Sequence, residues 1–218
     1  MALSTYAELK TAIQNYAARS DTAFTDRIDD FIDLAEDRIH FGGEDAFKTE
    51  PLRILGMETS ADLSISTQEV AQPTGWLESK RLYINSSPLY DVDYLPPDRF
   101  WASDAANSNV TGKPIIYTTE GTNFVFAYSP DSTYTGKLLY YKKLDPLSDS
   151  ATTNWLITNS PATYLYACLL EYSIWAMDDR QSAKYAALFQ SRINGMFRQD
   201  NKARHSGSTL RVRVDQTP

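Results

Sequence analysis

Apolar residues recur at helical spacing most densely between Thr152 and Asp179. Ser160 can cap a helix with its hydroxyl, and Pro161 suits the first helical position, which needs no amide hydrogen. The apolar positions that follow spread beyond one face of the helix. Because such a helix has to be covered by other elements, the pattern predicts the central helix of a bundle. Its apolar positions are Leu165, Cys168, Leu169, Leu170, Tyr172, Ile174, Trp175 and Ala176.

Two amphipathic patterns lie near the N-terminus. Thr5 and Glu8 form a capping-box pattern that begins the first helix, and Asp21 can cap the second. The second helix is predicted from about Thr22 to His40, and Gly42 ends it. Its apolar face comprises Phe24, Ile28, Phe31, Ile32, Ala35 and Ile39. Its acidic face comprises Asp26, Asp29, Asp30, Asp33, Glu36 and Asp37.

A last helix is predicted after Asp178 and Asp179, because carboxylates are stabilised at the positive end of a helix. Gly195 costs up to about 1 kcal/mol relative to alanine, so we expect fraying or a bend near it. From Asn201 the sequence is polar, and Ser206-Gly207-Ser208 supplies a hinge. The face of this helix comprises Tyr185, Leu188, Phe189, Arg192, Ile193 and Met196.

Between the helical regions the hydrophobic period changes to alternation, which is typical of strands. Pro96-Pro97-Asp98 starts a helical turn that carries Phe100 and Trp101. Short turns between successive strands predict an antiparallel meander and not a parallel sheet. The predicted strands cover residues 63–65, 76–84, 89–95, 115–119, 123–128 and 137–143.

These period changes predict an α+β protein. Residues 1–56 and 151–203, from both chain ends, form one helical bundle. Residues 57–150 form an antiparallel β-rich domain inserted between them. Residues 204–218 form a flexible C-terminal arm, in which residues 210–214 alternate strictly between apolar and basic.

The composition is that of an ordinary globular protein, with 218 residues, 42% of them apolar and 22% charged. The net charge of −7 argues against a protein that grips nucleic-acid phosphates. We expect no membrane helix, since no apolar run reaches the roughly 20 residues required, and no signal peptide. Cys168 is the single cysteine, so an internal disulfide is impossible. The 14 tyrosines suit either an interface or half-buried strands.

We find no motif for catalysis, and we expect no cofactor and no metal. His40 and His205 are far apart in sequence and neither lies in a motif with a nucleophile. The acidic face lacks the glycine-bearing loop of a calcium site, and its carboxylates project outward instead of converging. Asp91 and Asp93 are the nearest pair for acid–base chemistry, but alternation places both on the outer side of a strand. The sequence therefore predicts a protein that is not an enzyme.

Several short motifs together resemble the head-to-tail adaptor proteins of tailed bacteriophages, of the kind found in short-tailed phages. They occur in the order of that family from Thr5 to about Val214. The helical motifs are Asn154-Trp155-Leu156, Asn159-Ser160-Pro161, Tyr164-Leu165-Tyr166 and Leu169-Leu170-Glu171. The β-region motifs are Gly112-Lys113-Pro114 with Tyr117, the hairpin at Gly121, and Leu139-Tyr140-Tyr141 running into residues 144–148.

The resemblance implies a structural virion protein at the head–tail junction, made in the host cytoplasm. Its subunits form a dodecameric ring beneath the portal, and double-stranded DNA passes through during packaging and ejection without sequence-specific contacts. The implied partners are the portal protein, neighbouring copies of the chain and tail or nozzle proteins, with no membrane.

The resemblance also suggests roles for three groups of residues. The C-terminal arm would clasp the portal, the acidic face named above would form either a subunit contact or the channel wall, and the insert would meet the tail. The arm residues are Leu210, Arg211, Val212, Arg213 and Val214, and the tail-facing residues are Phe100 and Trp101.

Two other classes stay open. A carbohydrate-recognising or tail-tip β module would use exposed aromatic rings to stack on sugars, and a hydrolase of unfamiliar type would need a carboxylate pair. Electron microscopy with a portal ring separates these classes from an adaptor, because only an adaptor adds a second ring. The candidate stacking residues are Trp76, Tyr90, Tyr94 and Trp101.

Overall fold

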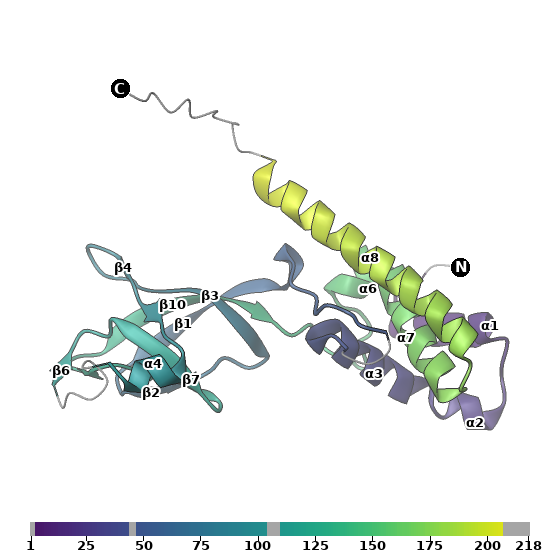
Figure 1. Ribbon diagram of the computed structural model, residues 1–218, viewed down its shortest axis with the longest axis horizontal. Helices are drawn as coiled ribbons and strands as arrows, with labels where there is room; N and C mark the ends of the chain where they lie inside the picture. The colour runs from purple at the N-terminus through teal and green to yellow at the C-terminus, as the bar shows by residue number, and fades with distance from the viewer. Residues whose placement is uncertain (1–2, 44–46, 104–109, 207–218) are drawn as a thin grey trace. The chain divides into compact units, whose positions relative to one another are not determined.

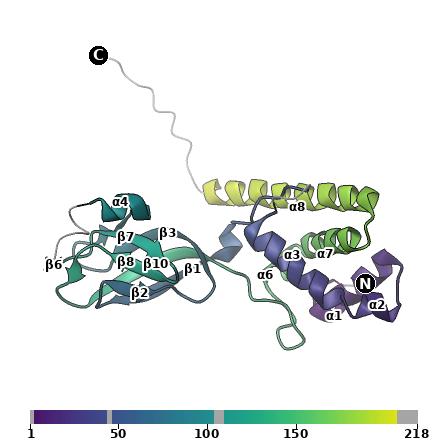
Figure 2. The same ribbon diagram turned by 60° about the horizontal axis from the view of Figure 1, so that its bottom comes forward.

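The computed structural model describes residues 3–43, 47–103 and 110–206, and the chain divides into two compact units (Figure 1 and Figure 2). The helical unit draws on Met1–Gly56 and Asp145–Pro218, and the β unit on Met57–Leu144. Helices make up the first unit and mainly strands the second, which confirms the predicted α+β class.

Two helices of the helical unit, α1 and α8, begin at residues with the expected capping chemistry. The Thr5 hydroxyl accepts a hydrogen bond from the amide of Glu8 at 3.3 Å, which confirms the predicted capping box of α1. Asp178 caps α8 by accepting a hydrogen bond from the amide of Gln181 at 3.0 Å. The helices are α1 (Tyr6–Ala17), α2 (Thr22–Thr25), α3 (Ile28–Phe41), α6 (Trp155–Asn159), α7 (Pro161–Trp175) and α8 (Asp179–His205).

The second amphipathic pattern forms two helices, so the predicted continuous helix from Thr22 to His40 is wrong. α2 ends at Thr25 and α3 begins at Ile28. The break allows both Phe24 and Phe31 to contact the ring of Tyr172, with centroid distances of 5.0 and 6.0 Å. Tertiary packing thus overrides local helix propensity here.

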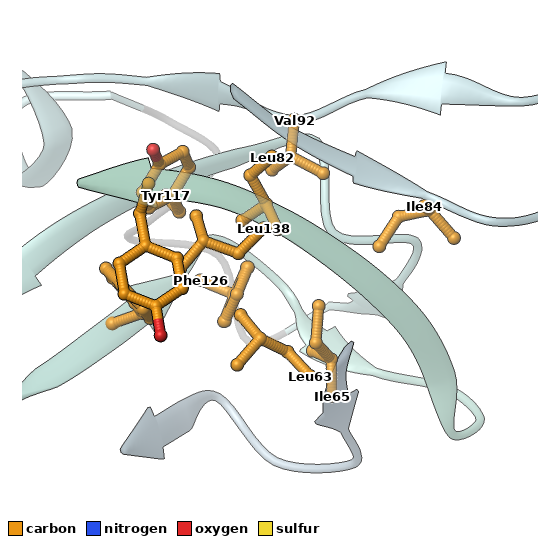
Figure 3. Close-up of a cluster of buried hydrophobic side chains, with 10 residues drawn as sticks. Leu63, Ile65, Leu82, Ile84, Val92, Tyr117, Phe126 and Leu138 are labelled. Atoms are coloured by element: carbon orange, nitrogen blue, oxygen red, sulfur yellow. The ribbon is translucent and has the colours of Figure 1, made fainter. Parts of the chain in front are cut away.

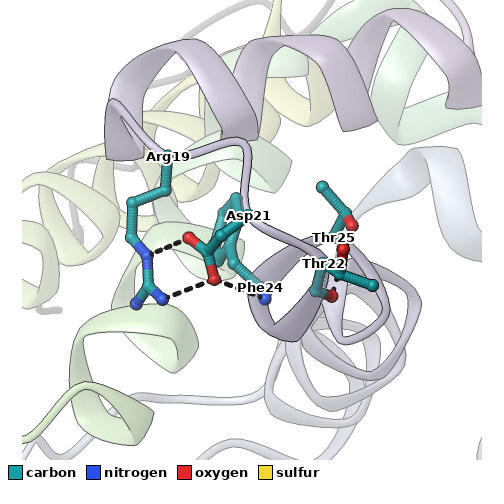
Figure 4. Close-up of polar contacts among 5 residues, drawn as sticks. All are labelled: Arg19, Asp21, Thr22, Phe24 and Thr25. Atoms are coloured by element: carbon teal, nitrogen blue, oxygen red, sulfur yellow. Dashed lines mark hydrogen bonds and ion pairs between the residues drawn. The ribbon is translucent and has the colours of Figure 1, made fainter.

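Asp21 fixes the start of α2 (Figure 4). Its carboxylate accepts a hydrogen bond from the amide of Phe24 at 3.2 Å and pairs with Arg19 at 2.8 Å. The Arg19 guanidinium also lies over the ring of Phe24, 5.5 Å from its centroid. The predicted cap at Asp21 is therefore confirmed, and Arg19 holds it in place.

The cap of α7 differs from the prediction. Pro161 occupies the first turn as expected, but the Ser160 side chain makes no capping hydrogen bond. Its hydroxyl pairs with the hydroxyl of Thr163 at 2.8 Å. The reason is that α6 ends at Asn159, so Ser160 also terminates α6, and its amide donates to the carbonyl oxygen of Leu156 at 2.8 Å.

α7 is buried along nearly its whole length: every residue from Thr163 to Ser173 except Tyr166 is buried. It contacts α1, α3, α6 and α8. α8 continues through Gly195 to His205, so residues 201–205 are helical and not part of the predicted polar tail. The chain beyond Ser206 lies outside the described residues.

The β unit holds two four-stranded sheets and a two-stranded pair. The first sheet has the order β1-β10-β3-β4, the second β2-β8-β7-β5, and β6 pairs with β9. The described strands are β1 (Glu58–Ile65), β2 (Glu69–Ala71), β3 (Trp76–Ile84), β4 (Tyr90–Asp91), β5 (Asp93–Tyr94), β6 (Thr111–Gly112), β7 (Ile116–Glu120), β8 (Asn123–Phe126), β9 (Ser129–Pro130) and β10 (Tyr134–Lys142). The short helices are η1 (Leu55–Met57) and α4 (Pro97–Trp101).

The predicted antiparallel meander is only partly right. The long ladders of β10 with β1 and β3 are antiparallel, but β5 pairs with β7, and β6 with β9, in parallel. The segment predicted as one strand from Leu89 to Leu95 forms β4 in one sheet and β5 in the other. Val92 lies at this switch and is buried.

The two four-stranded sheets share one hydrophobic core (Figure 3). Leu82 and Leu138 come from the first sheet, and Tyr117 and Phe126 from the second. Gly136 sits above this core in β10, where an added Cβ would come within 2.9 Å of Ile65 Cδ1. The sheets are therefore held by side-chain packing between them, as in other face-to-face sheet pairs.

Candidate interaction surfaces

The acidic face predicted on α2 and α3 is largely on the surface. Asp26, Asp29, Asp30, Asp33 and Asp37 are all exposed. Glu36 is the correction, since it is only 4% exposed and lies at the edge of the apolar face of α3, about 40° around the axis from Ile32. It cannot serve an outer contact or a channel wall.

Glu36 belongs to a buried polar network instead. Its carboxylate accepts hydrogen bonds from the amide of Leu147 at 2.9 Å and from the hydroxyl of Tyr164 at 3.2 Å. Asn154 donates to the Tyr164 oxygen at 2.7 Å, and its own side-chain oxygen caps α6. Burial and the negative charge of Glu36 raise the pKa of Tyr164, so the phenol stays protonated and able to donate. The network joins α3, α6 and α7.

A buried ion pair reinforces the same junction. Arg38 on α3 donates to the carboxylate of Glu171 on α7, and each side chain is 9% exposed. Cys168, one turn before Glu171, is fully buried, and burial together with the charges of Glu36 and Glu171 raises the pKa of its thiol well above the ordinary value. A protonated, buried thiol is a poor nucleophile, so this cluster is structural.

The exposed carboxylates differ in how they are paired. Asp29 binds Lys10 at 2.7 Å, and although burial opposes its ionisation, the hydrogen bonds from Lys10 and Tyr6 hold the pKa of Asp29 below the ordinary value. Asp30 pairs with Arg27 at 3.0 Å. Asp26 and Asp33 form no ion pair with any residue the structure describes. These two charges are open to an external partner.

The two residues predicted to face the tail separate in the structure. Phe100 is fully buried in a small cluster with Val125 and Ala127, so its assignment as a tail contact is wrong. Trp101 is 45% exposed, and its indole nitrogen donates to the carboxylate of Glu120. Adjacent residues of a helical turn point in different directions, which the sequence pattern did not resolve.

A hollow of about 510 Å³ in the β unit contains the predicted carboxylate pair and two of the predicted stacking residues. Asp91 forms a two-point ion pair with Arg81, and this hydrogen bonding lowers the pKa of Asp91, which disfavours a role as general acid. Trp76 packs edge-on against Phe124, and Tyr94 against Tyr117. Both rings therefore pack against other aromatic rings of the β unit.

The remaining sequence predictions concern the C-terminal arm, metal sites and membrane helices. The arm residues Leu210, Arg211, Val212, Arg213 and Val214 lie outside the described residues. In the described ranges, no group of three or more His, Cys, Asp or Glu side chains is placed to hold a metal ion. None of the described helices is long and apolar enough to span a bilayer.

One surface that the sequence analysis missed lies on α8. Its outward side carries basic residues, small residues and Leu188 but no acidic residue, and it lies opposite the buried Tyr185, Phe189 and Ile193. The residues of this side recur at spacings of three, four and seven, which is a helical pattern. The stronger apolar pattern of the opposite face hides it in the sequence. This basic stripe comprises Lys184, Leu188, Ser191, Gly195, Arg198 and Lys202.

Replacing Glu36 tests the buried network. Glu36→Ala leaves the Leu147 amide and the Tyr164 hydroxyl without their buried acceptor, so we expect a loss of about 1–3 kcal/mol in the free energy of unfolding. The exposed Asp33→Ala variant should stay within about 0.5 kcal/mol of the parent. Urea unfolding followed by circular dichroism measures both. Equal stability of the two variants would contradict the structural role of Glu36.

Comparison with known proteins identifies the family of the chain. A family model described as SU10 adaptor protein matches residues 4–213, which covers nearly the whole chain and both units. No curated protein compared with the chain matches it. The chain therefore belongs to the SU10 adaptor protein family, a family of bacteriophage head-to-tail adaptors.

Proposed function

We propose that the chain is a structural subunit of a closed ring, dodecameric as in the family it resembles, that seats beneath the portal and connects the capsid to the tail. The observation that carries this is the adaptor family match, because it spans residues 4–213. The protein then acts through surfaces and not through a catalytic site. Its place is the head–tail junction of the virion, after synthesis in the host cytoplasm.

The proposed subunit has three parts. Helices from both chain ends form one bundle, and the contacts of α7 with α1, α3 and α8 support this. The β unit is an insertion between these helices and faces the tail or nozzle proteins. The segment after Ser206 binds the portal.

The acidic charge of the chain suits a ring through which double-stranded DNA passes. A net charge of −7 disfavours retention of DNA phosphates, so the ring would not hold the genome during packaging or ejection. A ring also needs a heterologous interface, in which one face of each subunit fits a different face of its neighbour. The exposed carboxylates Asp26, Asp29, Asp30, Asp33 and Asp37 are candidates for either surface.

Ring assembly on the portal is the direct test. Purified protein mixed with portal rings of the same phage should add a second ring beneath the portal, visible by negative-stain electron microscopy and as a shift in sedimentation. The protein alone should sediment as a monomer, since we propose that the portal templates assembly. Portal rings that stay bare at saturating protein would refute the proposal.

Truncation after Ser206 tests the arm. The shortened protein keeps all of α8, so its melting temperature should match that of the full chain. Its binding to portal rings should fall by about tenfold or more, because the truncation removes the proposed portal-binding residues. Two point-variant sets separate these contributions: Leu210, Val212 and Val214 changed to Ser, and Arg211 and Arg213 changed to Ala. Unaltered portal affinity after truncation would show that the segment after Ser206 does not bind the portal.

Trp101 is the matched test of the tail-facing surface, with Phe100 as its control. Trp101→Ala should leave the stability nearly unchanged and lower tail attachment to portal–adaptor complexes, because the exposed indole is lost from the contact. Phe100→Ala should lower the free energy of unfolding by about 3–5 kcal/mol, since it opens a cavity. Full tail attachment by Trp101→Ala would show that this surface is not used.

A further inference from the structure

α3 and α8 lie on roughly opposite sides of α7. Tyr172 of α7 contacts Phe31 of α3, whereas Thr163 and Ser173 of α7 hydrogen-bond to Met196 and Ser182 of α8. At 3.6 residues per turn, Thr163 lies about 180° and Ser173 about 100° around the α7 axis from Tyr172. α7 therefore packs between α3 and α8, and the outer sides of α3 and α8 face away from each other.

The outer side of α8 is a basic helix face, and its residues are exposed. Lys184, Arg198 and Lys202 lie with Leu188 within a sector of about 80° around the axis. Arg198 and Lys202 are exposed and form no ion pair with any described residue. A stripe with three positive charges and no carboxylate favours an acidic partner.

The outer side of α3 has the complementary charge. Asp30, Asp33 and Asp37 lie with Leu34 within a sector of about 100°. Asp33 forms no ion pair with any described residue, and Leu34 is 51% exposed between these carboxylates. We call Asp30, Asp33, Leu34, Asp37 and Phe41 the acidic stripe.

We propose that the basic stripe of α8 in one subunit docks on the acidic stripe of α3 in the next copy of the chain. This inference rests on the ring proposed above and names the two faces of its heterologous contact. Around the ring, α8 of each subunit would then be followed by α3, α7 and α8 of the next subunit. It also assigns the acidic stripe to the subunit interface and not to the channel wall.

Shape as well as charge supports this pairing. A shallow hollow of about 550 Å³ lies along the basic stripe, lined by Ala187, Ser191, Gly195 and Arg198 among others. A Cβ added at Gly195 would meet nothing within 4 Å, so the helix backbone there is open to close approach. Leu34 is an apolar side chain that the neighbouring copy can insert into this hollow, and the surrounding charges then pair at its rim.

A charge swap tests the contact. Asp33→Arg and Arg198→Glu should each lower the fraction of portal rings that carry a second ring, with about tenfold weaker assembly, because like charges then face each other. In the double variant the charges of both faces are reversed, so opposite charges meet again at every contact. Assembly should therefore return toward the parent level. Arg192→Glu is the matched control, because Arg192 lies on the same helix about 120° around the axis from Arg198.

The outcomes are separable. Loss in both single variants, recovery in the double variant and a normal Arg192→Glu control support the contact. Parent-like assembly of both single variants overturns it, as does failure of the double variant to recover while its melting temperature is unchanged; in either case the ring proposal stands. If the parent protein adds no second ring to the portal, the proposed function itself fails, and this contact fails with it.

Discussion

α7 has almost no polar face, and the rest of the helical unit follows from the need to bury it. A helix that is apolar all round is stable in water only when other elements cover it. Its neighbours come from both parts of the chain that make up the helical unit: α1 and α3 from the N-terminal part, α6 and α8 from the C-terminal part. The covering helices need only one apolar face each, which leaves their outer faces free to carry charge and to meet other proteins.

Two pairs of polar side chains are buried inside this packing. Glu36 and Tyr164, and Arg38 and Glu171, are buried as partners. Burying an ion pair adds little to stability, but removing one partner from it is costly. Such pairs therefore favour one alignment of α3 against α7, because any slip would leave a buried charge without its partner. The exposed stripe on α3 keeps its direction as a consequence.

In the β unit the corresponding constraint is the core shared by two sheets. β10 holds the first sheet together by pairing with both β1 and β3, and the segment around Val92 passes from that sheet to the other. This change of sheet explains why Tyr90 and Tyr94, four residues apart in one alternating pattern, end in different surroundings. α4 covers a separate small cluster through Phe100, so Trp101 is left on the surface.

The sequence by itself determined the features that depend on neighbouring residues. These are the capping box at Thr5, the caps at Asp21 and Asp178, the apolar character of α7, and the bounds of strands such as β3, because caps and periodicity are local. Only the tertiary structure decided that Glu36 faces inward among carboxylates that face outward, and that α2 and α3 are separate helices. The same holds for Phe100 and for the assignment of β4 and β5 to different sheets. In each case the decision depends on a partner distant in sequence, such as Tyr164, Tyr172 or Val125, and no local pattern records where that partner lies.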